Sequence, residues 1–279
     1  MKMLPAVVTI GNGTSALVIA DRITENGVQK LKPCIQKYEP VSPKSEAFGM
    51  VLEDFRARAH ALGAEIEIAA VPSALFTEEL AGLIEKKLWI EPQIISADDE
   101  RALIFSALAE RYGEGIVSLN IGEKTTELCS AKKNLSLPAG FELLFEQMGP
   151  IPGPEYKNWS KELFKEYPVK PYAKMPVFLA GDLARAFVKV LFNSPRDHLE
   201  KMEGFEVDLP TLEQTITRIS NLSLELRASL PGLENGRHRT ILCGLFLLRS
   251  LFEKLRAESF QISLTGIHSG LLYRIQEKQ

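Results

Sequence analysis

Two turns in the sequence combine an Ile-Gly pair with hydroxyl side chains, and each lies between two runs rich in β-branched residues. The first is Gly11-Asn12-Gly13-Thr14-Ser15, between the runs 6–10 and 16–20. The second is Gly122-Glu123-Lys124-Thr125-Thr126, between the runs 116–121 and 125–131. Backbone N–H groups of a glycine-rich turn can cradle a phosphate. Because Asn-Gly is also what an ordinary hairpin turn prefers, the sequence alone leaves both interpretations open.

A third feature that could do chemistry is the acidic start of a predicted helix. Ser96 has the character of an N-cap, and Asp98, Asp99 and Glu100 follow it in the first turn. A carboxylate at this place could serve as a general base. Acidic residues also favour the first turn of any helix because of the helix dipole, so a purely structural role stays open.

The elements that must position these residues follow from periodicity and turn signals. Strands are expected at 6–10, 16–20 and 28–35, the last after Asn26-Gly27, and then at 65–71 and 93–95. Helices are expected at 43–62, from Thr77 on, and at 96–111. The first part therefore has the order βββαβαβα, which predicts a mixed sheet.

The second part begins with the same βββ pattern and then diverges. Expected strands are 116–121, 125–131, 134–137, 175–180 and 261–265. Expected helices are 141–148, 157–165, 182–192 with Asp182 as its N-cap, 210–230 and 237–256, with loops at 149–154 and 193–208. An internal duplication explains the repeat, with domains at 1–114 and 115–279.

Composition excludes several classes of protein. The chain has 279 residues, 45% of them hydrophobic and 25% charged, which is an ordinary globular balance. The net charge of −3 gives no basic field for DNA or anionic lipid. We expect no signal peptide and no membrane span, because the longest apolar run is short. We expect a cytoplasmic location, because the three cysteines are scattered.

With these residues laid out, the chain resembles the exopolyphosphatase and guanosine-pentaphosphate phosphatase (Ppx/GppA) family along nearly its whole length. Ile10-Gly11 with Thr14-Ser15 resembles the family's first phosphate loop, and Asn120-Ile121-Gly122 with Thr125 to Leu128 resembles the second. The stretch from Ile94 to Phe105 resembles I-I-S-G-x-E-E-A-R-L-I-F, and Ser136-Leu137-Pro138-Ala139-Gly140 resembles S-L-P-L-G. Further similarities are Ile241 to Gly244 and the closing stretch from Gly266 to Leu272.

The resemblance implies an α/β protein with two ribonuclease-H-like domains facing a central cleft, the fold of actin, sugar kinases and heat-shock chaperones. It implies a phosphoanhydride hydrolase that acts on inorganic polyphosphate or pppGpp and uses Mg²⁺. We also expect a homodimer. Glu100 falls at the position of the catalytic base. Phosphate contacts are implied for Gly11, Asn12, Gly13, Thr14, Ser15, Gly122, Lys124, Thr125 and Thr126.

Two departures from the family pattern concern the metal. Thr9 and Asn120 occupy positions where the family has aspartates. Neutral side chains hold a hard divalent cation poorly, so we expect neither residue to be a ligand. Glu123 and Lys124 also replace two glycines of the second loop.

These departures leave three functions open. The first is a polyphosphate or pppGpp phosphatase with weak or altered activity, and the second is a non-catalytic protein that binds a nucleotide, a phosphate ligand or a protein partner. The third is a purely structural dimer module. Whether the protein is an enzyme at all is therefore not decided by its sequence.

Overall fold

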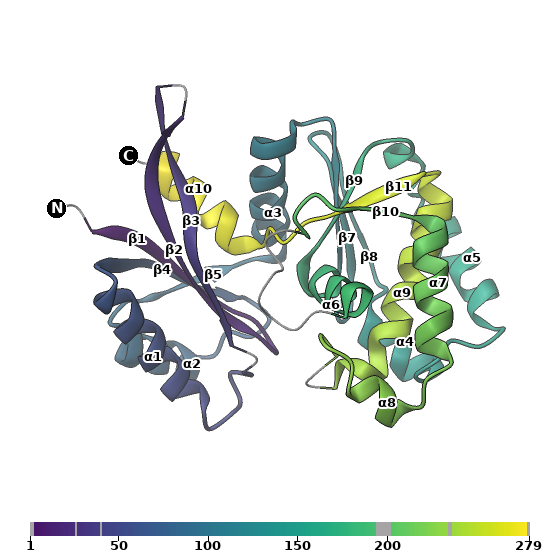
Figure 1. Cartoon of the computed structure of the whole chain (residues 1–279), viewed down its shortest axis with the longest axis horizontal. Helices are drawn as coiled ribbons and strands as arrows, with labels where there is room; N and C mark the ends of the chain where they lie inside the picture. The colour runs from purple at the N-terminus through teal and green to yellow at the C-terminus, as the bar shows by residue number, and fades with distance from the viewer. Residues whose placement is uncertain (1–2, 26, 40, 194–201, 234–235, 278–279) are drawn as a thin grey trace. The chain divides into compact units, whose positions relative to one another are not determined.

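The computed structural model describes residues 3–25, 27–39, 41–193, 202–233 and 236–277. Contacts divide the chain into two compact units, Met1–Ala107 with Gly266–Gln279 and Leu108–Thr265. We expected the division 1–114 and 115–279. The contacts place the first boundary inside helix α3 (Ala97–Tyr112), and they assign helix α10 (Ile267–Glu277) to the first unit (Figure 1). Asn26, expected in a hairpin turn, lies outside the described residues.

The first unit is built on a five-stranded sheet in the order β3-β2-β1-β4-β5. Its strands are β1 (Leu4–Ile10), β2 (Ser15–Glu25), β3 (Val28–Glu39), β4 (Ala64–Pro72) and β5 (Pro92–Ile95). The first three strands form an antiparallel meander, whereas β1, β4 and β5 run parallel. The carboxyl ends of the three parallel strands therefore share one edge of the sheet.

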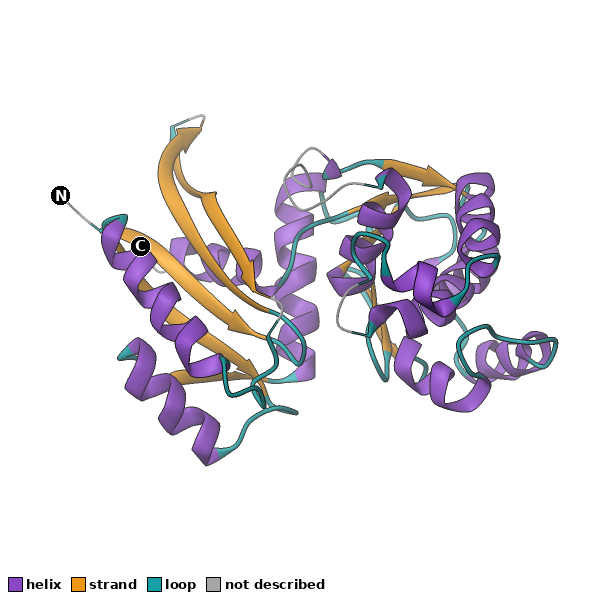
Figure 2. Cartoon of the chain, turned by 60° about the horizontal axis from the view of Figure 1, so that its bottom comes forward, coloured by secondary structure: helices purple, strands orange, loops and turns teal. Residues whose placement is uncertain are grey.

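Helices cover both faces of this sheet (Figure 2). Helices α1 (Phe48–Ala61) and α2 (Glu78–Leu88) pack on the face that carries Ala6, Val8 and Ile10. Helix α10 and the first part of α3 pack on the face that carries Val7. Because successive side chains of a strand point to opposite faces, a strand covered on both sides is mostly hydrophobic, as β1 is apart from Thr9.

The second unit has a six-stranded sheet in the order β10-β11-β9-β6-β7-β8. Its strands are β6 (Val117–Ile121), β7 (Thr126–Cys129), β8 (Asn134–Leu137), β9 (Val177–Ala180), β10 (Glu206–Asp208) and β11 (Ser259–Ile262). Strands β6, β7 and β8 form an antiparallel meander, and β6, β9 and β11 run parallel. Thus 8-7-6-9-11 repeats the plan 3-2-1-4-5 of the first sheet, and the predicted duplication and α/β fold class are confirmed.

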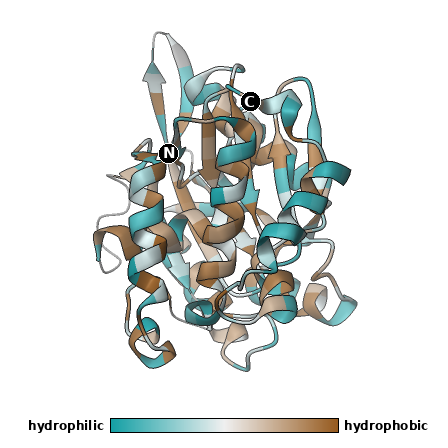
Figure 3. Cartoon of the chain, turned by 90° about the vertical axis from the view of Figure 1, so that its right-hand side faces the viewer, coloured by the Kyte–Doolittle hydropathy of each residue, from teal (hydrophilic) through white to brown (hydrophobic). Residues whose placement is uncertain are grey.

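Helix α9 (Arg237–Leu255) is the centre of the second unit's core. It is buried on almost all sides, and the other helices pack around it. Those elements are α4 (Phe141–Met148), α5 (Tyr156–Glu166), the 3₁₀ turn η1 (Lys170–Tyr172), α6 (Gly181–Phe192), α7 (Leu209–Ser220) and α8 (Leu224–Ala228). Figure 3 shows hydrophobic and hydrophilic residues alternating along the outer helices, as expected for helices with one buried side.

Three local predictions were wrong. The helix expected at 210–230 is two helices, because Ser223 caps α8 by accepting from the Leu226 N–H. The expected loop 193–208 contains β10, while residues 194–201 lie outside the described part of the chain. Asp182 is not an N-cap: Ala180 holds that position, since β9 leads directly into α6 through Gly181 at φ +82°.

The Glu203 carboxylate joins two segments of the second unit. One oxygen accepts from the Tyr112 hydroxyl at 3.0 Å and from the Ser263 hydroxyl at 3.0 Å. The other oxygen accepts from the Leu264 N–H at 2.6 Å. Burial and the Glu203 charge raise the pKa of Tyr112 to about 12. The last turn of α3 and the segment after β11 are therefore tied to the same carboxylate.

Candidate functional site

The turn between β1 and β2 is closed by one hydrogen bond. The Gly11 N–H donates to the Thr14 carbonyl at 2.9 Å, and Ile10 pairs with Ser15. A Cβ atom at Gly11 would lie 2.8 Å from the same carbonyl oxygen, so this position requires glycine. Asn12 and Gly13 are exposed at the tip. The turn is therefore a tight hairpin that needs glycine at its first position, and its role in phosphate binding stays a prediction.

Ser15 has a hydroxyl group without a partner at the base of this turn. The residue is fully buried, and its Oγ makes no hydrogen bond within the described part of the chain. An unsatisfied buried hydroxyl costs free energy, which a ligand oxygen can recover. This is an observation that favours an acceptor, such as a phosphate oxygen, at the turn.

The turn between β6 and β7 has the same construction. The Gly122 N–H donates to the Thr125 carbonyl at 2.8 Å, which repeats the bond between Gly11 and Thr14. Lys124 and Thr125 are exposed. Thr126 is fully buried, and its hydroxyl donates to the Ala139 carbonyl at 2.6 Å. Of the residues predicted here, Thr126 thus supports the turn from inside.

The second turn also rests on the start of α4. The N–H groups of Phe141, Glu142 and Leu143 donate to the carbonyls of Gly122 and Glu123 at 2.9–3.1 Å. These N–H groups are the ones that a helix leaves without an intrahelical partner. Gly140 makes this approach possible, because a Cβ atom there would lie 2.5 Å from the Lys124 nitrogen. The turn is therefore fixed against α4.

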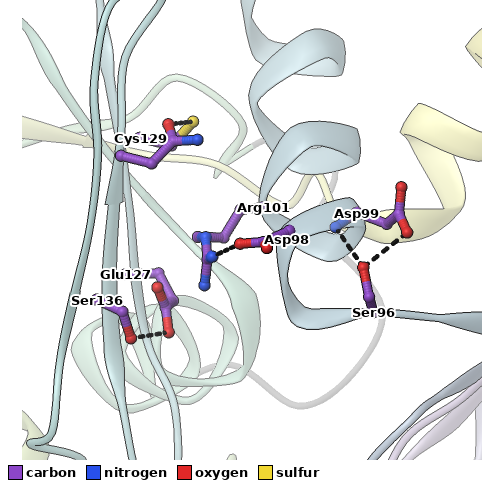
Figure 4. A network of polar contacts seen from close by, with 8 residues as sticks. Ser96, Asp98, Asp99, Arg101, Glu127, Cys129 and Ser136 are labelled. Atoms are coloured by element: carbon purple, nitrogen blue, oxygen red, sulfur yellow. Dashed lines mark hydrogen bonds and ion pairs between the residues drawn. The ribbon is translucent and has the colours of Figure 1, made fainter.

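Asn120 belongs to a polar row that crosses three strands. Asn120 on β6 is the register partner of Glu127 on β7, and Glu127 is the partner of Ser136 on β8. The Ser136 hydroxyl donates to Glu127 Oε1 at 2.8 Å (Figure 4). Directly opposed residues point to the same face of a sheet. The row therefore places a carboxylate beside the amide of Asn120.

Glu127 was not among the residues predicted from the sequence, although a signal for it existed. A turn from Gly122 to Thr125 makes Ile121 pair with Thr126, and the next pair is then Asn120 with Glu127. The register of a hairpin follows from the length of its turn. The position of Glu127 could therefore have been counted out from the second turn.

Thr9 and Glu100 lie at the corresponding edge of the first sheet. Thr9 is the penultimate residue of β1 and is buried. It lies two residues after Val7 and therefore on the same face of the sheet, the face that packs against α10 and Leu103 of α3. Glu100 lies in the first turn of α3, directly after β5, and its N–H donates to the Ser96 carbonyl at 2.9 Å. Because β1 and β5 run parallel to β4, both residues belong to the carboxyl edge, where α/β sheets commonly bind ligands.

The two acids beside Glu100 have structural partners. Ser96 Oγ accepts from the Asp99 N–H at 3.1 Å and donates to Asp99 Oδ2 at 2.7 Å. Asp99 Oδ1 pairs with Arg274 of α10 at 3.3 Å. The Ser96 hydroxyl and then the Arg274 guanidinium hold the pKa of Asp99 below its ordinary value. Asp98 pairs with Arg101 (Figure 4). The cap predicted at Ser96 is confirmed.

A small charged cluster lies at the starts of α4, α6 and α9. Arg237 pairs with Asp182 at 3.2 Å and lies over the Phe141 ring. Its side chain is only 20% exposed. Burial and then the Glu123 charge raise the pKa of Glu142, while Arg239 and Arg237 lower it. The cluster belongs to the same edge as the second turn, because β9 and β6 run parallel into α6 and the turn.

Comparisons agree with the repeated turn and the two sheets. A sequence model of the Ppx/GppA phosphatase family matches residues 69–279. The fold is similar to that of the Aquifex aeolicus family member, with a TM-score of 0.77, 18% identity, and 99% of each chain covered. It is also similar to an exopolyphosphatase from Cytophaga hutchinsonii, with a TM-score of 0.77, 16% identity, and 99% of this chain and 98% of that chain covered. The curated protein sequences contain no match to the chain.

The family match begins in β4, so it covers Glu100 and the second turn but not the first. The structural similarities extend over both turns and both sheets. Within the described part of the chain, no helix is long and apolar enough to cross a bilayer. The chain belongs to the Ppx/GppA phosphatase family.

Proposed function

We propose that the protein hydrolyses phosphoanhydride bonds of inorganic polyphosphate or of pppGpp, at a low rate. The observation that supports this proposal is the repeated turn, closed in the same way by Gly11 and by Gly122 at the carboxyl edge of each sheet. The other N–H groups of such a turn can cradle a phosphate. Membership of the phosphatase family supports it. Phosphoryl transfer needs mainly positioning and charge neutralisation, which such turns and a few side chains provide.

We propose phosphate contacts for each turn separately. In the first they are the backbone of Gly11, Asn12, Gly13 and Thr14 together with the Ser15 hydroxyl, which lacks a partner within the described residues. In the second they are the backbone of Gly122, the exposed Thr125 and the Lys124 ammonium group. The Lys124 charge would also offset the nearby Glu123.

Glu100 is the proposed base that orients or deprotonates the attacking water. Its two acidic neighbours are engaged elsewhere, Asp99 with Ser96 and Arg274, and Asp98 with Arg101. A carboxylate that performs this task contributes about 10²–10⁴-fold to the rate. Glu100 also lies at the carboxyl edge of its sheet, where the first turn lies.

A divalent ion, Mg²⁺ by expectation, would be held by Glu127. Mg²⁺ in phosphate sites is commonly bound through one or two carboxylates together with the substrate's phosphates. The second sheet offers one carboxylate at this position, Glu127, oriented by Ser136, with the Asn120 amide beside it. The ion would neutralise phosphate charge. With Thr9 and Asn120 neutral, this donor set is weaker than one containing two further aspartates, which is why we expect a low rate.

The test is phosphate release from long-chain polyphosphate and from pppGpp with Mg²⁺ or Mn²⁺. Glu100→Gln should lower the rate by about 10²-fold or more. Asp98→Asn is the matched control, because it neutralises an exposed acid in the same helical turn and should retain the wild-type rate. Equal rates in the wild type and Glu100→Gln would remove Glu100 as the base.

No release by any variant would leave a non-catalytic binder as the function. Thermal shift then decides, because a ligand that binds only the folded state stabilises it by RT ln(1 + [L]/Kd). Titration with polyphosphate and with guanosine nucleotides should raise the melting temperature for a binder, and a flat response would contradict phosphate binding altogether. The expected homodimer also stays a prediction, which light scattering of the purified protein checks.

A further inference from the structure

Helix α10 contacts helix α3 in the first unit at two places. Gly270 of α10 lies against Leu103 of α3, and Arg274 pairs with Asp99. Four residues separate the two positions on each helix, which is about one helical turn. The later residue on α10 meets the earlier residue on α3. These two contacts, which we call the seam, join two helices that are far apart in the sequence.

The seam is close enough for the two backbones to touch. A Cβ atom at Gly270 would overlap the Leu103 carbonyl oxygen and lie 2.6 Å from the Leu103 carbonyl carbon. Around this point, Leu271, Leu272 and Ile275 of α10 are buried in one cluster with Leu103 and with Ile95, the last residue of β5. Helix α10 is therefore in close contact with α3 at Gly270.

The Arg274–Asp99 pair acts on the turn that carries Glu100. Asp99 is held on one oxygen by the Ser96 hydroxyl and on the other by Arg274. Both side chains of the pair are more than a third exposed, Asp99 to 47% and Arg274 to 35%. Ion pairs of this kind contribute little to stability. Because the pair joins α10 to the first turn of α3, we expect its effect to be on the direction of that turn.

We propose that α10 is a positioning element for Glu100, with Gly270 and Arg274 as positioning residues that act through Leu103 and Asp99. This inference rests on the proposed role of Glu100 as the base. A base must lie within hydrogen-bond reach of its water, and a misplacement of about 1 Å can lower a rate by about 10²-fold. Glu100 adjoins Asp99 in the chain, so movement of the first turn moves both.

Arg274→Met removes the pair and leaves the Ser96 cap in place. It should lower kcat about 10-fold and leave KM within about twofold, because positioning affects the reaction and not substrate binding. Arg274→Lys restores the charge and should recover most of kcat. The matched control is Arg58→Met, which breaks an exposed Asp54–Arg58 pair on α1 of the same unit and should leave kcat unchanged. Wild-type kcat in Arg274→Met, or an equal loss in Arg58→Met, would overturn the proposal.

A second measurement separates this inference from the proposed function. Amide hydrogen exchange of the peptide that contains residues 96–103 should accelerate in Arg274→Met and not in Arg58→Met. If the wild type proves inactive, the hydrolase proposal fails while accelerated exchange still establishes the seam. Unchanged exchange in Arg274→Met would show that α10 does not hold the first turn of α3, whatever the activity.

Discussion

Asn120 and Glu127 are direct neighbours across the β6–β7 ladder, so the Asn120 amide has the Glu127 carboxylate beside it. Under the proposed function, Glu127 is the residue that we expect to hold the metal. Glu127→Gln should abolish the response of phosphate release to Mg²⁺. Ser136→Ala removes the hydrogen bond from Ser136 to Glu127 Oε1 and should raise the Mg²⁺ concentration for half-maximal activity by about 10–100-fold. An unchanged Mg²⁺ response in Glu127→Gln would place the metal elsewhere.

Restoring the acids should restore activity. The double variant Thr9→Asp with Asn120→Asp should release phosphate faster than the wild type, because two hard oxygen ligands return to the carboxyl edges of the sheets. Asn120→Asp alone offers a readout that does not need activity. Two carboxylates directly opposed on neighbouring strands repel each other, so its melting temperature should fall without metal and rise again with Mg²⁺. If the melting temperature of Asn120→Asp does not change when Mg²⁺ is added, the metal role of this pair is contradicted.

Gly181 should not tolerate a side chain. Its φ is +82°, and a Cβ atom would overlap Asn120 Oδ1 and lie 3.0 Å from Asn120 Cγ. Gly181→Ala should lower the free energy of unfolding by about 1–3 kcal/mol. The loss should be smaller in an Asn120→Gly background, since the overlap is then removed. Gly13→Ala is the control, because a Cβ atom there meets no other atom within 4 Å. Urea denaturation of the four variants measures these differences, and an equal loss in both backgrounds would exclude the contact.

Tyr112 should make stability fall at alkaline pH. Its pKa is raised from 10.0 to about 12, so the folded state keeps a proton that the unfolded state has lost. The stabilisation is complete below pH 10 and is lost as the pH rises towards about 12. Tyr112→Phe should therefore flatten the decline of unfolding free energy over this interval, measured by denaturation at successive pH values. Burial also raises the pKa of Tyr172 to about 12, so Tyr172→Phe is the comparison that gives a second, independent flattening. A slope identical to that of the wild type would show that Tyr112 titrates normally.

Local patterns were sufficient to predict much of this structure. The two Ile-Gly turns, the repeated βββ order and helix α4 at Phe141–Met148 follow from periodicity and turn residues that lie close together in the chain. The break between α7 and α8 was missed, although Ser223 is a usual N-cap residue, because the apolar periodicity continues across it.

The remaining features depend on contacts that no local pattern encodes. Asp99 and Arg274 are 175 positions apart in the sequence. Each is a charged residue of a type that is usual on the exposed side of a helix. Gly270 sits inside a helix, where glycine usually lowers helix propensity, and only the approach of Leu103 explains it. Helix α10 itself was not predicted from periodicity, because its packing depends on contacts with distant parts of the chain.

The division of the first unit into two chain segments has a consequence for protein synthesis. Its sheet and helices α1 and α2 are complete before the second unit is translated, but α10 follows afterwards. Until then, Val7, Val18, Ala20 and Ala70 lack the side chains of Leu271, Leu272 and Ile275 that cover them. At usual translation rates the intervening residues Leu108–Thr265 take on the order of ten to thirty seconds. For that time the nascent chain presents an uncovered apolar sheet face, which is the kind of surface that chaperones bind.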